Sequence, residues 1–275
     1  MLEVLYNFVN YPELNHCEYD DLSVVDKIIL DTREIDLSLY PNLTVISRVG
    51  VGVDNIDIDE CKRRNIPVYI TPCRELSNAV ANFTVMQMLN LLSYDNPRES
   101  IDTKNVLIVG CGRIGSAVFD RLRVFCDCDS IDLPYYPNIE DYNRYKNKLA
   151  NMIGKFDIVT VHASGNKEIL NSDLIRNMKK GSYLLNMARK ECIDFEAAVG
   201  CLSDGNLSGV ASDVNSLKDL SKSTWDTFYH CCIDKLLLTD HIASNTIEAR
   251  KEMERLALDN LNFIDNQSTM GYRVV

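Results

Sequence analysis

The feature that most constrains the fold is a short apolar run that leads directly into three spaced glycines. Residues 106–109 read Val-Leu-Ile-Val, and Gly110, Gly112 and Gly115 follow in the pattern G-x-G-x-x-G. Apolar residues then recur at helical spacing, at Ile114, Ala117, Val118, Leu122 and Phe125. A strand that turns through such glycines into a helix is the fingerprint of a dinucleotide-binding α/β domain.

Each glycine has its own physical reason. Gly110 lets the chain turn tightly out of the strand, Gly112 lets the backbone approach a pyrophosphate, and Gly115 lets the helix pack close to the sheet. The phosphates would then lie at the positive end of the helix dipole, beside Arg113 and Ile114. A plain strand–helix turn is the alternative interpretation.

An acidic residue strengthens the prediction of a nucleotide site, because such a residue is expected about twenty positions after the glycines. Asp132 ends the predicted second strand, where a carboxylate accepts hydrogen bonds from ribose hydroxyls and repels a 2′-phosphate. The sequence therefore predicts NAD rather than NADP as the cofactor. Asp127 and Asp129 lie in the same segment, so an ordinary loop acid is the alternative interpretation of Asp132.

Apolar runs rich in β-forming residues alternate with helical patterns along the whole chain, which is typical of parallel α/β architecture. Strands are expected at Leu2–Val9, Lys27–Leu30, Leu43–Val49 and Pro67–Thr71, and in a second series at Val106–Val109, Ser130–Asp132, Asp157–Val161, Tyr183–Asn186, Gly209–Asp213 and Leu236–Thr239. The second series fits a doubly wound sheet.

Two helices and a boundary complete the predicted outline. A helix is expected over Asn78–Leu92, and the turn-forming residues of Ser93–Lys104 mark a domain boundary after it. A final helix is expected to begin near Asn245, because Asn245 and Glu248 form a capping signal.

The composition limits partners and location. A net charge of −11 disfavours nucleic acid and anionic membranes as partners. No apolar run is long enough to span a bilayer, and the first thirty residues lack a basic region followed by an apolar run, which favours the cytoplasm. The ten cysteines are then expected to be reduced thiols. Their spacing predicts no metal site, because neither Cys126-x-Cys128 nor Cys231-Cys232 has a second pair at zinc-site spacing.

Four blocks of the sequence resemble the D-isomer-specific 2-hydroxyacid dehydrogenases, in the order that this family has them. They are SRVGVGVDNIDIDECKRRNIPVYITP from Ser47 to Pro72, then NVLIVGCGRIGSAV, then FDIVTVHA through NMKKGSYLLNMARKECID to SGVASDV, and finally LLLTDHIASNTIEARKEMERLALDNL. The first block is most similar to the phosphoglycerate dehydrogenase branch. Arg33, Arg48 and Arg74 are candidates for binding a substrate phosphate, with solvated surface residues as the alternative.

The resemblance implies a doubly wound (Rossmann) cofactor domain over residues 96–242. This domain would be inserted in a smaller flavodoxin-like α/β substrate domain, residues 1–95 plus 243–275, with the active site in the cleft between them. The implied activity is NAD-dependent interconversion of a small 2-keto acid and its D-2-hydroxy acid. The resemblance also implies a homodimer, although Ser93–Lys104 is shorter than the arm with which the family builds its dimer.

The resemblance assigns catalytic roles to Arg189 in NMARKECID and to His241 in TDHIAS. A guanidinium clasps a carboxylate and the adjacent carbonyl oxygen, and an imidazole protonates the forming alkoxide. The alternatives are a surface arginine and a structural histidine. Other matched positions are expected to face the cofactor, namely His162, Ala188 and Asp213. A loop resembles the one whose N–H groups bind the substrate carboxylate, with a strand-ending turn as the alternative, namely Val49, Gly50, Val51 and Gly52.

One position departs from the family pattern. The family has a glutamate about five residues after the position of Asp213, against the catalytic histidine, and this chain has Lys218 there. Without that carboxylate, an imidazolium near Arg189 is destabilised by like charge. Asp219, the next residue, is the predicted substitute. The departure favours an alternative function, an NAD(H)-binding regulatory or corepressor-like module with little turnover, and a scaffold that no longer binds the cofactor is a third hypothesis.

Overall fold

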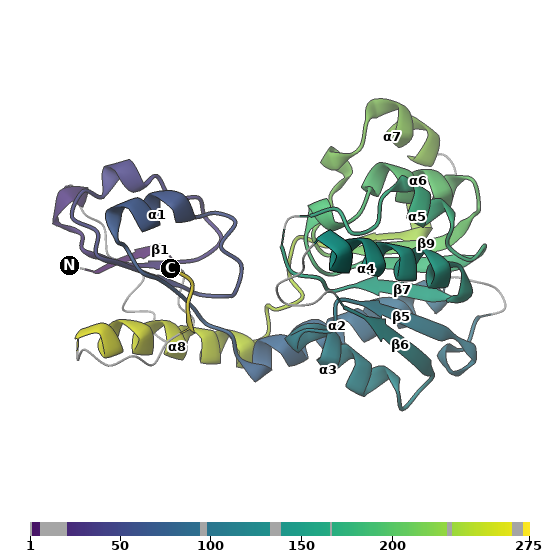
Figure 1. Ribbon diagram of the computed structural model, residues 1–275, viewed down its shortest axis with the longest axis horizontal. Helices are drawn as coiled ribbons and strands as arrows, with labels where there is room; N and C mark the ends of the chain where they lie inside the picture. Colours follow the sequence, from purple (N-terminus) through teal and green to yellow (C-terminus); the bar gives the residue numbers. More distant parts are fainter. Residues whose placement is uncertain are drawn as a thin grey trace. The chain divides into compact units, whose positions relative to one another are not determined.

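The computed structural model divides the chain into two compact units (Figure 1). Unit 1 comprises Met1–Leu76 and Asn245–Val275, and unit 2 comprises Ser77–Ser244, so unit 2 is inserted in the sequence of unit 1. The structure describes residues 2–5, 21–93, 98–132, 139–165, 167–229, 233–265 and 272–275. The predicted domain limits, after residues 95 and 242, stay a prediction.

Unit 1 contains a five-stranded sheet in the order β1-β2-β3-β4-β11. Its strands are β1 (Leu2–Leu5), β2 (Lys27–Leu30), β3 (Val45–Arg48), β4 (Val68–Ile70) and β11 (Tyr272–Arg273). The first four pair in parallel, and β11 joins β4 antiparallel. Two α-helices belong mainly to this unit, α1 (Ile58–Arg64) and α8 (Ile247–Asp265).

Local signals explain where the helices of unit 1 begin and how they attach. The Asp57 carboxylate accepts the N–H of Glu60 at 2.8 Å and so begins α1. On the other side, Ser47 of β3 donates its hydroxyl to the carbonyl of Ala257, and Asn260 donates to the same hydroxyl. These bonds lie among buried apolar side chains and fix α8 against β3.

Unit 2 is built on a six-stranded, wholly parallel sheet in the order β10-β9-β8-β7-β5-β6. The strands are β5 (Asn105–Val109), β6 (Asp127–Ile131), β7 (Ile158–Val161), β8 (Ser182–Asn186), β9 (Leu207–Ser212) and β10 (Leu236–Leu238). The chain leaves β5 for one neighbour, β6, and returns to the other side at β7. The sheet is therefore doubly wound, as predicted.

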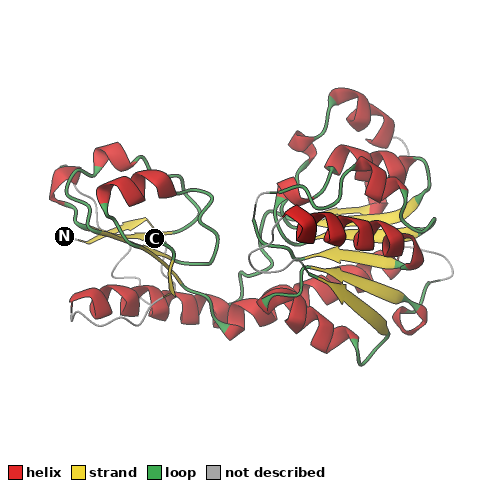
Figure 2. Ribbon diagram, in the orientation of Figure 1, coloured by secondary structure: helices red, strands yellow, loops and turns green. Residues whose placement is uncertain are grey.

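Helices lie on both faces of this sheet (Figure 2). They are α2 (Arg74–Ser93), α3 (Arg113–Leu122), α4 (Ile139–Met152), α5 (Ser172–Arg176), α6 (Phe195–Ser203) and α7 (Lys222–Tyr229). Short 3-10 helices occupy both units, at Leu22–Val24, Leu37–Leu39, Ile101–Thr103, Ile153–Lys155, Lys190–Cys192, Leu217–Asp219 and Ile233–Lys235. The central strands β5, β7, β8 and β9 are largely buried, which explains their mainly apolar sequences, whereas the edge strand β6 is mostly exposed and polar.

The predicted strands are confirmed as elements, with changed ends. β6 begins at Asp127, three residues before the prediction, and residues 6–9 of the first predicted strand lie outside the described residues. α2 begins one turn early at Arg74, where the Cys73 sulfur accepts the N–H of Leu76. The predicted cap of the last helix was wrong by one residue, because Thr246 rather than Asn245 accepts the N–H of Ala249.

Among the described residues, no helix is both long and apolar enough to cross a membrane. The cysteines within the described ranges are free thiols, and no three His, Cys, Asp or Glu side chains in those ranges are grouped to hold a metal ion. The cytoplasmic location, the homodimer and the lack of a metal site stay predictions.

Arg121 fastens α3 to α2 inside unit 2. Its guanidinium donates from Nε to Asn82 at 2.6 Å, from Nη2 to Asn78 at 2.9 Å, and from Nη1 to the carbonyl of Ala117 at 2.8 Å. Since α3 follows directly from the glycine segment, this contact holds the helix whose first turn carries that segment.

We therefore expect Arg121→Met to lower the free energy of unfolding by about 1–3 kcal/mol, because the two asparagine acceptors lose a charged donor. Arg123→Met is the matched control, since Arg123, the C-cap of the same helix, makes an exposed ion pair with Asp120, and its replacement should change stability by less than about 0.5 kcal/mol. Urea unfolding of both variants measures the difference, and equal effects would contradict the account.

Candidate functional site

The predicted residues of unit 2 all follow strands of one parallel sheet. Because the carboxyl ends of parallel strands lie at the same edge, these residues share that edge, at Gly110 after β5, Asp132 after β6, His162 after β7, Arg189 after β8, Asp213 after β9 and His241 after β10. The order of the strands reverses between β5 and β7, and ligands of doubly wound folds bind at this point of the edge.

The glycine segment is shaped by two close approaches of backbone. Gly110 has a positive φ of 90°, and a Cβ there would lie 2.5 Å from the nitrogen of Ala163, in the segment after β7. A Cβ on Gly115 would overlap the carbonyl oxygen of Gly110. Both positions therefore need glycine, for the turn and for the close packing of α3 that the sequence predicted.

Gly112 differs from its neighbours because a Cβ there would meet no atom within 4 Å. It precedes α3, so the N–H groups of the first helical turn, at Arg113 and Ile114, lie next to open space. The Asp132 carboxylate accepts the N–H of Cys111, the residue before Gly112, at 3.1 Å. A helix N-terminus that begins at a glycine with open space beside its α-carbon, near a carboxylate, fits a dinucleotide, with phosphates at the helix and ribose at the acid.

His162 is buried at the centre of the edge. Its backbone N–H donates to the carbonyl of Val109, and its Nε2 lies 2.9 Å from the hydroxyl of Thr160. The other ring nitrogen, Nδ1, is buried and has no hydrogen-bond partner among the described residues. Burial lowers the pKa of His162 to about 3, so the ring is neutral at physiological pH.

The segment after β8 places Arg189. The side-chain amide of Asn186 donates to the carbonyl of Arg189 at 2.9 Å, and its oxygen accepts the N–H of Ala188 at 3.2 Å. The half-buried Arg189 side chain donates from Nη1 to the carbonyl of Ala188. Its backbone is thus fixed by a buried asparagine.

Asp213 holds the segment that carries His241. Its buried carboxylate accepts the hydroxyl of Thr239 at 2.6 Å and the N–H groups of Ile242 and Ala243, each at 2.9 Å. Its carbonyl accepts the N–H of His241 at 2.8 Å. His241 itself is exposed and has a left-handed backbone with φ of 55°. Asp213 was expected to face the cofactor. In the structure its carboxylate accepts hydrogen bonds from Thr239, Ile242 and Ala243, on either side of His241.

Lys218 and Asp219 lie on the 3-10 helix Leu217–Asp219, and both are exposed. One carboxylate oxygen of Asp219 accepts the N–H of Ser216 at 2.7 Å and its hydroxyl at 3.3 Å, which closes a capping box. Asp219 therefore stabilises its own short helix in this structure, and its role as a substitute for the glutamate stays a prediction.

In unit 1, two of the four predicted carboxylate-binding amides are already bonded. Val49 donates its N–H to the carbonyl of Leu30, and Gly50 donates to the hydroxyl of Thr71 at 2.7 Å. Within the described ranges, no hydrogen bond is found for the N–H of Val51 or of Gly52. These two amides are the donors that remain for an anion.

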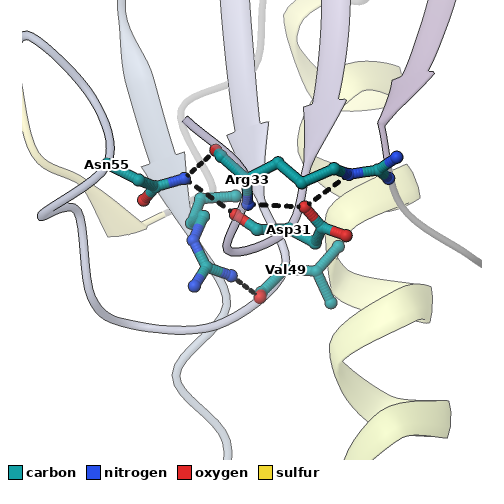
Figure 3. A network of polar contacts seen from close by, with 5 residues as sticks. Asp31, Arg33, Val49 and Asn55 are labelled. Atoms are coloured by element: carbon teal, nitrogen blue, oxygen red, sulfur yellow. Dashed lines mark hydrogen bonds and ion pairs between the residues drawn. The ribbon is translucent and has the colours of Figure 1, made fainter. Parts of the chain in front are cut away.

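Neighbouring segments brace this loop (Figure 3). Asn55 donates from one side-chain nitrogen to the carbonyls of both Asp31 and Arg33, and Asp31 accepts the N–H and Nε of Arg33. Arg48 is buried and donates to the carbonyl of Val49. The segments after β2 and β3 are thus held in fixed conformations.

Sequence reasoning missed the buried polar residues that support the edge, above all Asn186, Ser212 and Asn215. Their common signal is a polar side chain at, or just after, the end of a strand that is otherwise apolar. Buried polar groups need hydrogen-bond partners, so such positions indicate a network rather than core packing.

Comparison with known proteins agrees with this geometry. Residues 73–243 match the family model described as D-isomer specific 2-hydroxyacid dehydrogenase, NAD binding domain. A glyoxylate reductase of Thermofilum pendens is 35% identical, over 86% of this chain and 75% of that protein. A D-lactate dehydrogenase of Lactiplantibacillus plantarum is 29% identical, over 80% of this chain and 75% of that protein. The structure of a 2-hydroxyacid dehydrogenase of Ketogulonicigenium vulgare superposes with a TM-score of 0.79 at 24% identity, over 100% of this chain and 98% of that one.

Fold and glycine segment together define an NAD-binding α/β protein of the doubly wound class. The chain belongs to the D-isomer specific 2-hydroxyacid dehydrogenase family, and residues 73–243 are its NAD binding domain. The predictions of family, fold and cofactor are thereby confirmed.

The glycine geometry yields a paired prediction. Gly115→Ala should destabilise the protein by about 1–3 kcal/mol, because the new methyl group overlaps the carbonyl of Gly110. Gly112→Ala should leave stability nearly unchanged but weaken NADH binding about tenfold, because the methyl group enters the open space beside the helix N-terminus. Urea unfolding and NADH fluorescence titration test the two effects. Unchanged NADH affinity in the folded Gly112 variant would contradict this placement of the phosphates.

The burial of His162 predicts a pH dependence of stability. The unfolded histidine has a pKa of about 6.5, while the native pKa is about 3, so below pH 6.5 only the unfolded chain takes up this proton. The free energy of unfolding should therefore fall by up to about 1.4 kcal/mol for each pH unit below 6.5. Urea unfolding between about pH 7 and pH 5 should show a shallower pH slope in His162→Gln. An NMR titration of His162 with a midpoint near 6.5 would refute the burial argument.

Proposed function

We propose that this protein reduces a small 2-keto acid to the D-2-hydroxy acid with NADH, and catalyses the reverse oxidation, with Arg189 and His241 as catalytic residues. The observation that carries the proposal is the placement of both residues at the carboxyl edge that also bears the glycine turn. An arginine and a histidine at one edge supply the cation and the acid that this reduction needs.

The chemistry assigned to the chain's own residues is simple. NADH, when bound, supplies the hydride. The guanidinium of Arg189 clasps the carboxylate and the neighbouring carbonyl oxygen, and so polarises the carbonyl. His241 donates a proton to that oxygen as it becomes a hydroxyl, and takes the proton back in the oxidation. We propose separately that the amides of Val51 and Gly52, in unit 1, bind a carboxylate, as the resemblance implies.

The substrate class is proposed from the size of the relatives' substrates. The names of the two relatives refer to glyoxylate and to lactate, acids of two and three carbons. We therefore propose glyoxylate, pyruvate and hydroxypyruvate as the first substrates to test. The phosphorylated acid 3-phosphohydroxypyruvate completes the panel.

The decisive assay measures NADH oxidation with each of these acids. We expect turnover with at least one acid and a loss of at least about a hundredfold in kcat for His241→Ala, because general acid catalysis contributes about that much. NADH affinity should remain within about twofold in the variant. Activity that persists in His241→Ala would contradict the assigned mechanism.

Lys218 supports a second candidate function. An exposed lysine stands where the resemblance expects a glutamate, and Asp219 beside it is engaged in a capping box. A protein that binds NADH but turns over slowly, as a regulatory module would, fits this substitution. Tight NADH binding without turnover of any acid in the panel would favour it.

A charge reversal at Lys218 tests whether the missing glutamate limits turnover, and so distinguishes a dehydrogenase from a slow NADH-binding regulatory module. Lys218→Glu should raise kcat about tenfold if a carboxylate at this position stabilises the protonated His241, because tenfold corresponds to about 1.4 kcal/mol of transition-state free energy. Lys222→Glu is the matched control, since Lys222 is also exposed and makes the same change in net charge a few residues away. Equal rates in wild type and both variants would show that the missing glutamate does not limit turnover.

A further inference from the structure

We propose that Asn215 is a positioning residue that fixes the Arg189 loop and the His241 loop relative to each other. The inference rests on the proposed function, because it concerns the two residues that would act on one substrate. The resemblance gave Asn215 no role, and the residue does not belong to the glycine site. Its importance follows from the hydrogen bonds that it makes between the ends of β8 and β9.

The first of these bonds joins two buried amides. The side-chain nitrogen of Asn186, at the end of β8, donates to the side-chain oxygen of Asn215 at 2.9 Å. The same nitrogen donates to the carbonyl of Arg189. Asn186 and Asn215 are 0% and 3% exposed, so water does not compete for the bond between their side chains. Asn215 is therefore connected to the backbone of Arg189 through its hydrogen bond with Asn186.

A second group of bonds ties Asn215 to the end of β9. Its side-chain oxygen also accepts the hydroxyl of Ser212 at 2.9 Å, and its backbone N–H donates to that hydroxyl oxygen at 3.0 Å. Its side-chain nitrogen lies 3.4 Å from the carbonyl of Lys190, which follows Arg189. The Asn215 side chain thus accepts two hydrogen bonds and donates one, a combination that neither Asp nor Leu reproduces.

The chain of contacts continues to His241. Ser212 is followed by Asp213, whose carboxylate and carbonyl hold Thr239 and residues 241–243. A continuous buried path therefore leads from the Arg189 carbonyl through Asn186, Asn215 and the Ser212–Asp213 pair to the His241 loop. Every link lies within unit 2.

This path matters because the two catalytic groups must meet one small molecule. In the proposed reaction, Arg189 binds the carboxylate and carbonyl oxygen, while His241 donates its proton to that same oxygen. A misplacement of about 1 Å can cost on the order of a hundredfold in rate. A polar link in the core prevents the loops from drifting independently, whereas apolar contacts alone are not directional.

The primary test is Asn215→Leu, which keeps the side-chain size and removes all three side-chain hydrogen bonds. We expect kcat with the keto acid to fall about 10- to 100-fold, with NADH affinity within about twofold because the glycine turn is untouched. Asn215→Asp keeps an acceptor oxygen and should lose less kcat, and it serves as the test variant if the leucine variant fails to fold.

Thr84→Val is the control, since Thr84 is equally buried and its replacement removes one hydrogen bond elsewhere in unit 2. Its kcat should stay at the wild-type level.

A double-mutant cycle distinguishes positioning from general destabilisation. If Asn215 acts through Arg189, its substitution should cost much less in an Arg189→Lys background than in wild type. Amide hydrogen exchange in residues 189–192 and 241–243 should also accelerate in Asn215→Leu and not in Thr84→Val. Additive kinetic losses, or a kcat unchanged in a folded Asn215→Leu, would overturn the inference while leaving the proposed function intact. A wild type that reduces no acid would instead remove the proposed function.

Discussion

The parallel direction of the six strands in unit 2 is the constraint on which the site depends. Each strand ends at the same edge, so residues as far apart in sequence as Gly110 and His241 lie along one edge of a single sheet, with β7, β8 and β9 between their strands. The reversal of strand order between β5 and β7 then leaves room where the glycine turn lies. Chemistry is therefore concentrated in the loops, while the central strands β5, β7, β8 and β9 are largely buried.

Holding such loops in place requires polar groups inside the protein, where each must be paired. The Asp213 carboxylate meets this requirement by accepting three hydrogen bonds. Asn186 and Asn215 meet it through the hydrogen bond that Asn186 donates to Asn215. Buried hydrogen bonds of this kind are directional, and leaving one partner unpaired costs about 1–3 kcal/mol. The same groups that fix the fold of the edge therefore also fix the positions of Arg189 and His241.

Much of this arrangement was predictable from sequence, and the limits have physical causes. The strand before Gly110 and the helix after it were predictable because their pattern is local. The cap of α8 was not, since Asn245 and Thr246 both have cap-forming side chains and the surrounding structure chooses between them. Asn215 was also missed, because its partner Asn186 is 29 positions away and burial at a strand end cannot be read from one residue. The substitute role predicted for Asp219 depends on side-chain geometry that the sequence does not specify.

The central claim is that the edge bearing the glycine turn also binds a 2-keto acid through Arg189. Calorimetric titration with oxamate, an unreactive analogue of pyruvate, tests this without requiring turnover. The account predicts that oxamate binds to the NADH-loaded protein, and that Arg189→Met weakens this binding at least about tenfold, the effect of losing about 1.4 kcal/mol, while NADH affinity is unchanged. Oxamate binding that is equally tight in Arg189→Met would contradict the claim.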